Sequence, residues 1–236
     1  MKILGIESSS LVAGVALVTD GVLTAEYTMN DKKTHSQTLL PMLDEMVKMI
    51  ELDIKTVDAI AVAGGPGSFT GLRIGAATVK GLALALDKPV IQIPTVDALA
   101  YNLCGHRDLV CPLMDARRNQ VYTGLYRFEG NRMQTVKGQC AVDIREIVEE
   151  INLIEKPAVF LGDGVPVSKS YIEEHIKAPY SFAPPHLNRQ RAGAVAALAL
   201  QYLEEGKALD ADSFTPEYLR LSQAERERQE KSHAKD

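Results

Sequence analysis

The sequence predicts an α/β protein with mixed sheets flanked by helices, organised as two halves of similar topology. Short apolar runs typical of buried strands alternate with longer segments in which apolar residues recur every three or four positions, as in amphipathic helices. The order strand–strand–strand–helix–strand occurs once in each half of the 236-residue chain. With 46% hydrophobic and 24% charged residues, the composition is that of an ordinary globular chain.

The first half is expected to begin with three strands, at residues 2–7, 12–20 and 22–29. Asp20-Gly21 separates the last two strands, and this dipeptide favours a tight hairpin turn. Helical spacing follows at 35–51, where Pro41 lies near the helix start and its missing N–H costs little. The next elements are expected in the order strand, helix, strand and short helix, at residues 57–64, 70–86, 88–94 and 95–103.

The second half repeats this pattern. Its three strands are expected at residues 109–116, 119–128 and 133–142, with a turn at 129–132. A helix, a strand and another helix are expected at 143–155, 157–163 and 165–176. A long apolar helix over 189–205 ends at Gly206, a residue type common after helix C-termini. We therefore expect an N-terminal lobe, a smaller C-terminal lobe, a C-terminal helix with an extension, and a polar tail, at residues 1–103, 104–188, 189–222 and 223–236.

Composition and charge argue against several classes of protein. Three cysteines without a CxxC pair indicate reduced packing residues of a cytosolic protein. No apolar stretch approaches the roughly 20 residues of a membrane helix, so we expect a cytoplasmic chain with no membrane contact. The net charge of −5 disfavours independent nucleic-acid binding, which needs clustered Lys and Arg. If RNA is bound, a partner is expected to supply most of the contacts.

A glycine-rich loop, GGPGSFTGLRIG at residues 64–75, leads into the helix at 70–86. Its glycines favour a tight strand-to-helix turn, because glycine adopts positive φ at little cost. Helix N-termini after such loops can also bind phosphates, but the GK[ST] ending of a Walker A loop is absent. Turn formation is therefore favoured over phosphate binding. Gly71, Gly75 and Ala76 point to a third use, because small side chains let another helix approach closely.

The helix at 35–51 has an apolar arc wider than a one-sided surface helix needs. The arc has a central stripe and two flanks: Leu39, Leu43, Met46 and Ile50, then Leu40 and Val47, then Met42 and Met49. Either the helix is buried deep in its own core, or it packs one side on the sheet and the other on a partner. In the second case, the helices at 35–51 and 70–86 form a two-helix face that docks on two partner helices.

Five segments together resemble the bacterial TsaB (YeaZ) family: ILGIESSSLVAGVALV, HSQTLLPMLDEM, AVAGGPGSFTGLRIGAATVKGLALAL, DARRNQVY and PEYLR. The resemblance covers residues 1 to about 220. It implies an actin-like ATPase (ASKHA) fold of two RNase H-like lobes. It also implies a non-catalytic subunit in the making of threonylcarbamoyladenosine in tRNA, which binds the catalytic subunit TsaD, is joined by the ATPase TsaE, and forms homodimers in isolation.

The resemblance and the wide apolar arc together place the expected partner interface on the two-helix face. Contact with tRNA is then expected only through the complex. The expected interface residues are His35, Leu39, Leu40, Met42, Leu43, Met46, Thr70, Leu72, Arg73, Gly75, Ala76 and Val79.

The resemblance also indicates which chemistry this chain has lost. The catalytic relative has two metal-binding histidines where this chain has Thr95 and Leu99, and neither side chain replaces an imidazole ligand. No metal site is therefore expected. Glu7-Ser8-Ser9-Ser10 stands where active members have Asp-x-Gly, so no cofactor is required and only weak ATP or ADP binding is left open. The residues expected at such a nucleotide site are Glu7, Ser8, Ser9, Gly65, Ser68, Asp115 and Gly162.

The alternative to a scaffold is an enzyme: a weak ATPase or kinase of the actin-like fold, or a metal-dependent hydrolase such as a nuclease. A two-metal nuclease needs several carboxylates around one site, and the first lobe offers Glu7, Asp58 and Asp97. Asp58 begins its strand instead of ending it, so it is expected at the wrong end of the sheet. For Glu7 and Asp115 a structural role is favoured. They are expected to cap turns or to pair with an arginine, the candidates being Arg73, Arg117 and Arg118.

Overall fold

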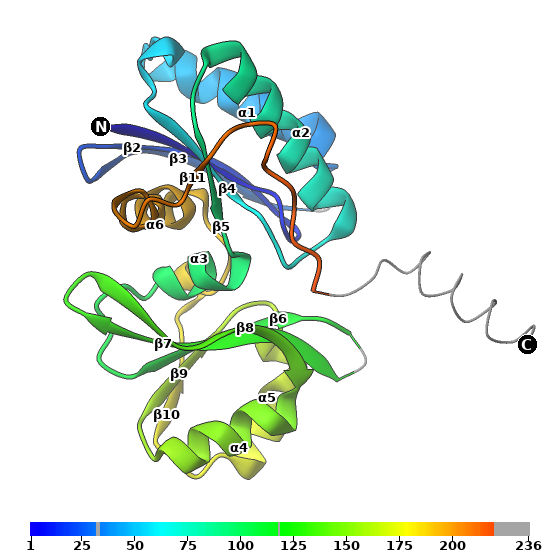
Figure 1. Cartoon of the computed structure of the whole chain (residues 1–236). Helices are drawn as coiled ribbons and strands as arrows, with labels where there is room; N and C mark the ends of the chain where they lie inside the picture. Colours follow the sequence, from blue (N-terminus) through cyan, green and yellow to red (C-terminus); the bar gives the residue numbers. More distant parts are fainter. Residues whose placement is uncertain (32–33, 118, 220–236) are drawn as a thin grey trace, which may run out of the picture.

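The computed structural model describes residues 1–31, 34–117 and 119–219, which form two sheets within five layers (Figure 1). Helices α1 and α2 cover the outer face of the first sheet, and α4 and α5 cover the outer face of the second. Helices α6 and α3 lie between the two sheets. The predicted α/β class with mixed sheets flanked by helices is therefore confirmed. The polar tail expected at 223–236 lies outside the described residues.

The first sheet has six strands in the order β11-β5-β4-β1-β2-β3. The central strands β1, β4 and β5 are parallel, and the others pair antiparallel with their neighbours. Asp20 and Gly21 both have positive φ between β2 and β3, so the predicted tight hairpin is confirmed. The strand bounds are Lys2–Glu7 (β1), Val12–Thr19 (β2), Val22–Asn30 (β3), Ala59–Ala63 (β4), Val90–Ile93 (β5) and Ala208–Leu209 (β11).

The second sheet has five strands in the order β10-β9-β6-β7-β8. Its strands β6, β9 and β10 are parallel, and β6, β7 and β8 are antiparallel. The bounds are Leu109–Asp115 (β6), Gln120–Glu129 (β7), Arg132–Asp143 (β8), Ala158–Leu161 (β9) and Tyr180–Phe182 (β10). Three strands, a helix and a strand thus recur in each half, as predicted.

The helices agree with the predicted periodicity, with one shifted start. Their bounds are His35–Met49 (α1), Phe69–Leu86 (α2), Thr95–Tyr101 (α3), Ile144–Ile154 (α4), Val165–His175 (α5) and Ala192–Glu204 (α6). Helix α6 begins at Ala192 and not at the expected residue 189, because Arg191 is extended and the Glu26 carboxylate accepts a hydrogen bond from Gly193 N at 2.9 Å. The sequence did not predict β10, β11 or the short 3-10 helices Ile54–Thr56 and Pro185–Leu187.

The core consists of three apolar clusters, one in each gap between a sheet and its neighbouring helices. The middle cluster joins both sheets, since it includes Ile3 and Ile91 of the first, Val110 and Leu161 of the second, and Val195 of α6. The outer clusters lie under α1 and α2 and under α4 and α5. The two lobes therefore share a continuous apolar core.

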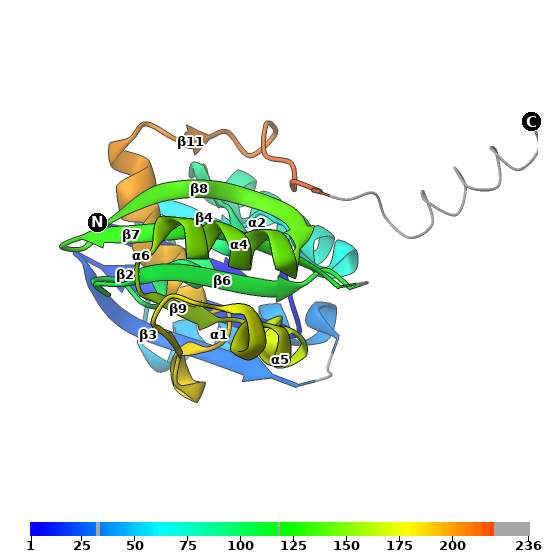
Figure 2. The same ribbon diagram turned by 90° about the horizontal axis from the view of Figure 1, so that it is seen from below.

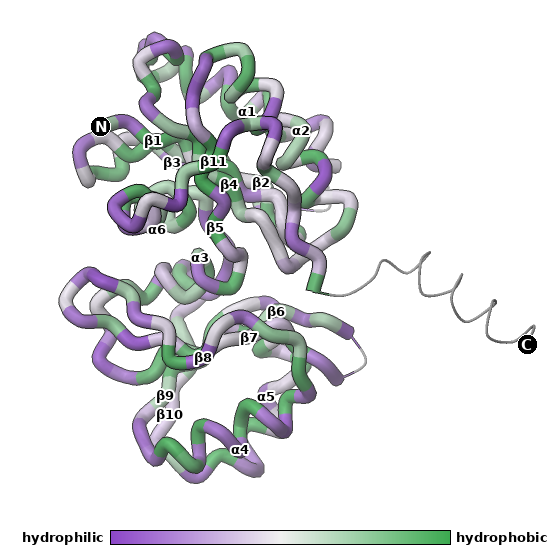
Figure 3. Tube along the Cα trace, in the orientation of Figure 1, coloured by the Kyte–Doolittle hydropathy of each residue, from purple (hydrophilic) through white to green (hydrophobic). Residues whose placement is uncertain are grey.

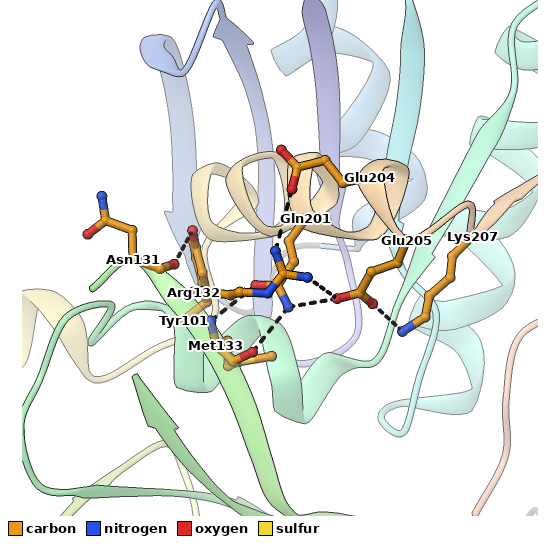
Figure 4. Close-up of polar contacts among 8 residues, drawn as sticks. All are labelled: Tyr101, Asn131, Arg132, Met133, Gln201, Glu204, Glu205 and Lys207. Carbon is orange, nitrogen blue, oxygen red and sulfur yellow. Dashed lines mark hydrogen bonds and ion pairs between the residues drawn. The ribbon is translucent and has the colours of Figure 1, made fainter. Parts of the chain in front are cut away.

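Polar contacts close one edge of this junction, between α6 and the β7–β8 hairpin (Figure 4). The Gln201 amide pairs with both backbone groups of Met133, with each hydrogen bond 3.1 Å long. Arg132 lies within ion-pair distance of Glu204 and Glu205. The two Gln201 hydrogen bonds resemble those between paired strands. Together with the two Arg132 ion pairs, they hold the β7–β8 hairpin of the second lobe against α6.

The expectation that no apolar stretch approaches the length of a membrane helix was wrong for α2, which among the described helices is long and apolar enough by length and composition alone, although it carries Arg73 and Lys80. Core helices of folded domains pass the same test. The inner side of α2 packs on the first sheet, where Leu72, Ala76 and Val79 are buried. Figure 3 shows hydrophobic residues at intervals along α1 and α2.

Candidate functional site

The glycine-rich loop connects β4 to α2, and its backbone groups are bonded within the chain. Ser68 N donates to Ser9 O at 2.6 Å, and Gly65 N donates to Thr95 Oγ1 at 3.2 Å. Four amides are occupied in this way, those of Gly64, Gly65, Ser68 and Gly71. A phosphate cradle needs such amides free, so the geometry supports the predicted turn over an anion site at these groups.

Close packing explains why glycines occupy the loop and the first turns of α2. A Cβ on Gly67 would lie 2.2 Å from Ser9 O. One on Gly71 would lie 2.1 Å from Ser8 O, and one on Gly75 would lie 2.3 Å from Ser8 Oγ. These two helical glycines therefore bring α2 against the end of β1. The expectation that they let a partner helix approach was wrong, because both face Ser8 of this chain, Gly71 its carbonyl oxygen and Gly75 its hydroxyl.

Glu7 ends β1 and is fully buried. Its Oε1 accepts hydrogen bonds from Ser9 N and Ser9 Oγ, so the predicted turn-capping role is confirmed. Desolvation raises the pKa of Glu7 to about 7, and the nearby Asp163 carboxylate adds to the effect. Among the described residues, Glu7 Oε2 has no hydrogen-bond partner. Arg73 does not pair with this carboxylate, since its guanidinium lies over the Phe69 ring.

The expected residues of the second lobe also stabilise turns. Asp115 ends β6, and its Oδ1 accepts a hydrogen bond from Arg117 N at 2.7 Å, so it caps the following turn as predicted. The alternative partner Arg118 lies outside the described residues. Gly162 has a φ of 111°, and its N–H donates to Asn188 Oδ1 at 2.5 Å.

The positions considered for metal ligands and nuclease carboxylates have structural roles. Leu99 is fully buried in the middle core, and Thr95 is buried with its Oγ1 bonded to the loop. The Asp58 carboxylate accepts a hydrogen bond from Lys2 N at 2.7 Å, at the opposite end of β1 from Glu7, as expected. Within the described ranges, no three His, Cys, Asp or Glu residues are placed to hold a metal ion.

The residues expected at a partner interface fall into two groups. The first group is buried by this chain's own residues: Leu39, Leu43, Met46, Leu72, Gly75, Ala76 and Val79. The second is exposed or half-buried: His35, Leu40, Met42, Thr70 and Arg73. Only the second group can contact a partner directly, and the first can act only by positioning α1 and α2.

Each of the two predicted flanks of α1 has one exposed residue and one half-buried residue. Leu40 exposes 53% of its surface and Met49 exposes 66%, and these residues come from opposite flanks. Val47 and Met42 are half-buried in the outer core. Neither flank as a whole faces solvent, so α1 offers isolated apolar contacts and not a continuous stripe.

Beyond Arg73, the fully exposed residues of α2 are apolar and mostly small. Gly81 is exposed, and a Cβ on it would meet no atom within 4 Å. Leu84 exposes 61% of its surface. We call this surface the docking face, and it consists of Ala77, Gly81, Leu84 and Ala85. Most of its side chains are small, and they do not pack into this chain's own core. It is therefore the part of α2 that another helix can approach closely.

Comparisons with known proteins identify the family. Residues 23–228 match the family model described as TsaD: tRNA N6-adenosine threonylcarbamoyltransferase. The tRNA threonylcarbamoyladenosine biosynthesis protein TsaB of Bacillus subtilis (strain 168) is 32% identical over 225 residues, which cover 95% of this chain and 96% of the relative. The chain belongs to the TsaB family. The resemblance seen in the sequence motifs is therefore confirmed.

Solved structures agree with membership of the TsaB family. YeaZ from Pseudomonas aeruginosa matches with a TM-score of 0.79 and 26% identity, covering 92% of this chain and 99% of that chain. An inorganic polyphosphate/ATP-glucomannokinase from Arthrobacter sp. strain KM matches with a TM-score of 0.51 and 13% identity, covering 86% of this chain and 99% of that chain. The second likeness shows the fold alone, and it confirms the actin-like ATPase fold.

Two sets of contacts in this TsaB-family chain went unrecognised in the sequence, where Asp97 was only a candidate nuclease carboxylate. Asp97 of α3 is buried and accepts hydrogen bonds from the hydroxyls of Tyr126 and Tyr202. The segment after α6 returns to the glycine-rich loop, where Glu217 N donates to Gly64 O at 2.7 Å. The motif PEYLR marked this segment, but no local pattern indicates which part of the fold it touches.

Proposed function

We propose that this chain is a non-catalytic scaffold and activator subunit of a cytoplasmic complex that makes N6-threonylcarbamoyladenosine in tRNA. It binds a TsaD-like catalytic subunit through α1 and α2, and a TsaE-like ATPase joins the complex. The tRNA is contacted only through the complex, and the isolated chain forms a homodimer through the same helices. Its 32% identity to a tRNA threonylcarbamoyladenosine biosynthesis protein over nearly the whole chain is the observation that carries the proposal.

The docking face supports this role. Helix α2 has 18 residues and is therefore about 27 Å long, which suits a specific helical interface of roughly 800 Å² per partner. Ala77 and Gly81 keep the middle of that helix narrow, and Leu84 supplies an apolar side chain with no partner in its own core. An exposed apolar surface of this kind favours a protein partner.

The polar groups at the strand ends and in the glycine-rich loop make contacts within the chain, and this supports a non-catalytic role. Glu7 and Asp115 cap turns, and the loop amides are bonded to other residues of the chain. A general base or a metal ligand needs its polar atoms directed at a substrate. Here the groups at the corresponding strand ends are used to hold the fold together.

The proposal is tested by reconstitution with the TsaD-like and TsaE-like subunits and unmodified tRNA. Omission of this chain should abolish threonylcarbamoyladenosine formation, measured by nucleoside mass spectrometry. Leu84→Asp should abolish association with the TsaD-like subunit in light scattering, because it places a charge on the docking face. Leu153→Asp is the matched control, since Leu153 of α4 exposes 84% on the second lobe and should tolerate the change. Full modification without this chain would contradict the proposal.

A further inference from the structure

Residues 208–219, which we call the C-terminal strap, run from α6 across the first lobe to the glycine-rich loop (Figures 1 and 2). The strap begins with β11, which pairs with β5. Phe214 is fully buried in the outer core, and Ala211 is buried beside it. Lys80 Nζ of α2 donates to Asp212 O at 3.3 Å. These contacts make the strap a fixed part of the fold.

The end of the strap links the loop to the second lobe. Glu217 N donates to Gly64 O at 2.7 Å, and Glu217 Oε2 accepts from Gln139 Nε2 of β8 at 2.9 Å. A Cβ on Gly65 would lie 2.1 Å from Glu217 O. Gly65, which was expected at a nucleotide site, is therefore needed for the close approach of the strap.

Tyr218, Phe69 and Arg73 pack in a row on the first turns of α2, and we call this row the stack; the Tyr218 ring is tilted by 41° to the Phe69 ring, and the Arg73 guanidinium lies over the Phe69 face. The Tyr218 ring centroid lies 5.1 Å from that of Phe69, and the Arg73 guanidinium lies 3.9 Å from the Phe69 centroid. Arg73 is exposed, and the structure of residues 1–31, 34–117 and 119–219 shows no ion pair to it. Stacking orients a guanidinium and leaves the N–H groups at its edge free for the planar, bidentate contact that a carboxylate makes.

The surroundings of Arg73 favour a protein carboxylate over a phosphate backbone. Arg73 precedes Ala77 by one helical turn on the exposed side of α2, so it borders the docking face. The other basic residue of α2 is Lys80, and it is used by the strap. A nucleic acid needs clustered cations, whereas one oriented cation beside a small apolar surface suits a helix that carries an acidic side chain.

We infer that the Tyr218–Phe69–Arg73 stack anchors the docking face by binding a carboxylate of the TsaD-like subunit. This inference rests on the proposed function. Tyr218 is a positioning residue in it, because it holds Phe69 and through Phe69 the guanidinium of Arg73. The strap is thereby part of the partner interface, and it connects that interface to β8 of the second lobe through Gln139.

Titration of the full chain with the TsaD-like subunit tests the stack. Arg73→Met keeps the apolar stem and should weaken binding about 10- to 100-fold, with a smaller loss as the salt concentration rises. Tyr218→Ala should weaken binding about 5-fold, and Tyr218→Phe should restore it. The matched control is Tyr180→Ala, since Tyr180 is also 39% exposed and also contacts a phenylalanine, Phe182. Thermal melting should show all four variants folded.

The double variant Arg73→Met, Tyr218→Ala shows whether Tyr218 acts through Arg73 or contacts the partner by itself. If Tyr218 acts through Arg73, then Tyr218→Ala should add no further loss in the Arg73→Met background. An equal loss in both backgrounds overturns the inference. If Arg73→Met binds the TsaD-like subunit as tightly as the wild type does, the inference is overturned and the proposed function stands. If the wild type itself does not bind, both the proposed function and the inference are overturned. Arg73-dependent binding of tRNA by the isolated chain overturns the assignment to a protein carboxylate.

Discussion

The carboxylate of Asp97 accepts a hydrogen bond from the hydroxyl of Tyr126 at 2.6 Å, and this contact joins the two lobes. Asp97 belongs to α3 and Tyr126 to β7 of the second sheet. Tyr202 of α6 donates to the other carboxylate oxygen at 2.8 Å. Burial raises the pKa of Asp97 while these hydroxyls lower it. A buried carboxylate of this kind is stable only while its partners stay in place.

Removal of the Tyr126 hydroxyl should therefore destabilise the junction between the lobes, although only one oxygen atom is lost. Tyr126→Phe leaves Asp97 Oδ1 buried without its donor, and we expect the free energy of unfolding to fall by about 1–3 kcal/mol. Urea denaturation measures the loss. Tyr180→Phe is the control, because that hydroxyl lies on an exposed strand of the second lobe. Equal stability of the Tyr126 variant and the wild type would show that the contact does not hold the lobes.

Glu7 makes stability depend on pH. Its folded pKa of about 7 exceeds its ordinary value of 4.5, so the folded state retains a proton that the unfolded state loses. The stabilisation is fully present below about pH 4.5 and is lost as the pH rises to about 7. Glu7→Gln mimics the protonated acid. It should stabilise the chain at pH 8 by on the order of 3 kcal/mol and by much less at pH 5.

The measurement for Glu7 is urea denaturation of wild type and variant at both pH values. The difference in the free energy of unfolding between the two proteins removes the contribution of the other titrating groups. Glu45→Gln on the exposed side of α1 is the matched control and should change little at either pH. A stability difference for Glu7→Gln that is the same at pH 5 and pH 8 would contradict the pKa of Glu7.

Periodicity and turn residues predicted the strands and helices that have a pattern of their own. The three-residue β10 and two-residue β11 are too short to show one. The contact between Glu217 and Gly64 joins segments distant in the chain, and no local preference encodes it. The same limit applies to the site. A stripe of small residues on α2 predicts a close approach, but the sequence does not say that Gly75 faces β1 and Gly81 faces solvent.

Those two glycines should respond oppositely to alanine. At Gly75 the new Cβ would lie 2.3 Å from Ser8 Oγ, which is buried and donates to Gly71 O. Overpacking should lower the free energy of unfolding by about 1–3 kcal/mol. At Gly81 the new Cβ meets nothing within 4 Å, so Gly81→Ala should raise stability by about 0.5–1 kcal/mol through helix propensity and a less flexible unfolded chain.

Chemical denaturation of the two alanine variants checks the assignment of the helix faces. A larger side chain then separates folding from association. Gly81→Leu should leave the isolated chain folded and prevent docking of the TsaD-like subunit, because it fills the narrow part of the docking face. Stabilisation by Gly75→Ala, or unchanged association of Gly81→Leu in light scattering, would contradict the proposed orientation of α2.

The isolated chain should not hydrolyse ATP. Four loop amides are bonded internally, and the Glu7 carboxylate is buried and bonded to Ser9. A metal-bound nucleotide would have to displace these contacts and ionise Glu7, whose pKa is already raised to about 7. Calorimetry with Mg-ATP and a phosphate-release assay test this, with the TsaE-like ATPase as the positive control. Micromolar binding with turnover that Glu7→Gln abolishes would instead support the enzyme hypothesis, because it would require Glu7 to leave its turn and reach the nucleotide.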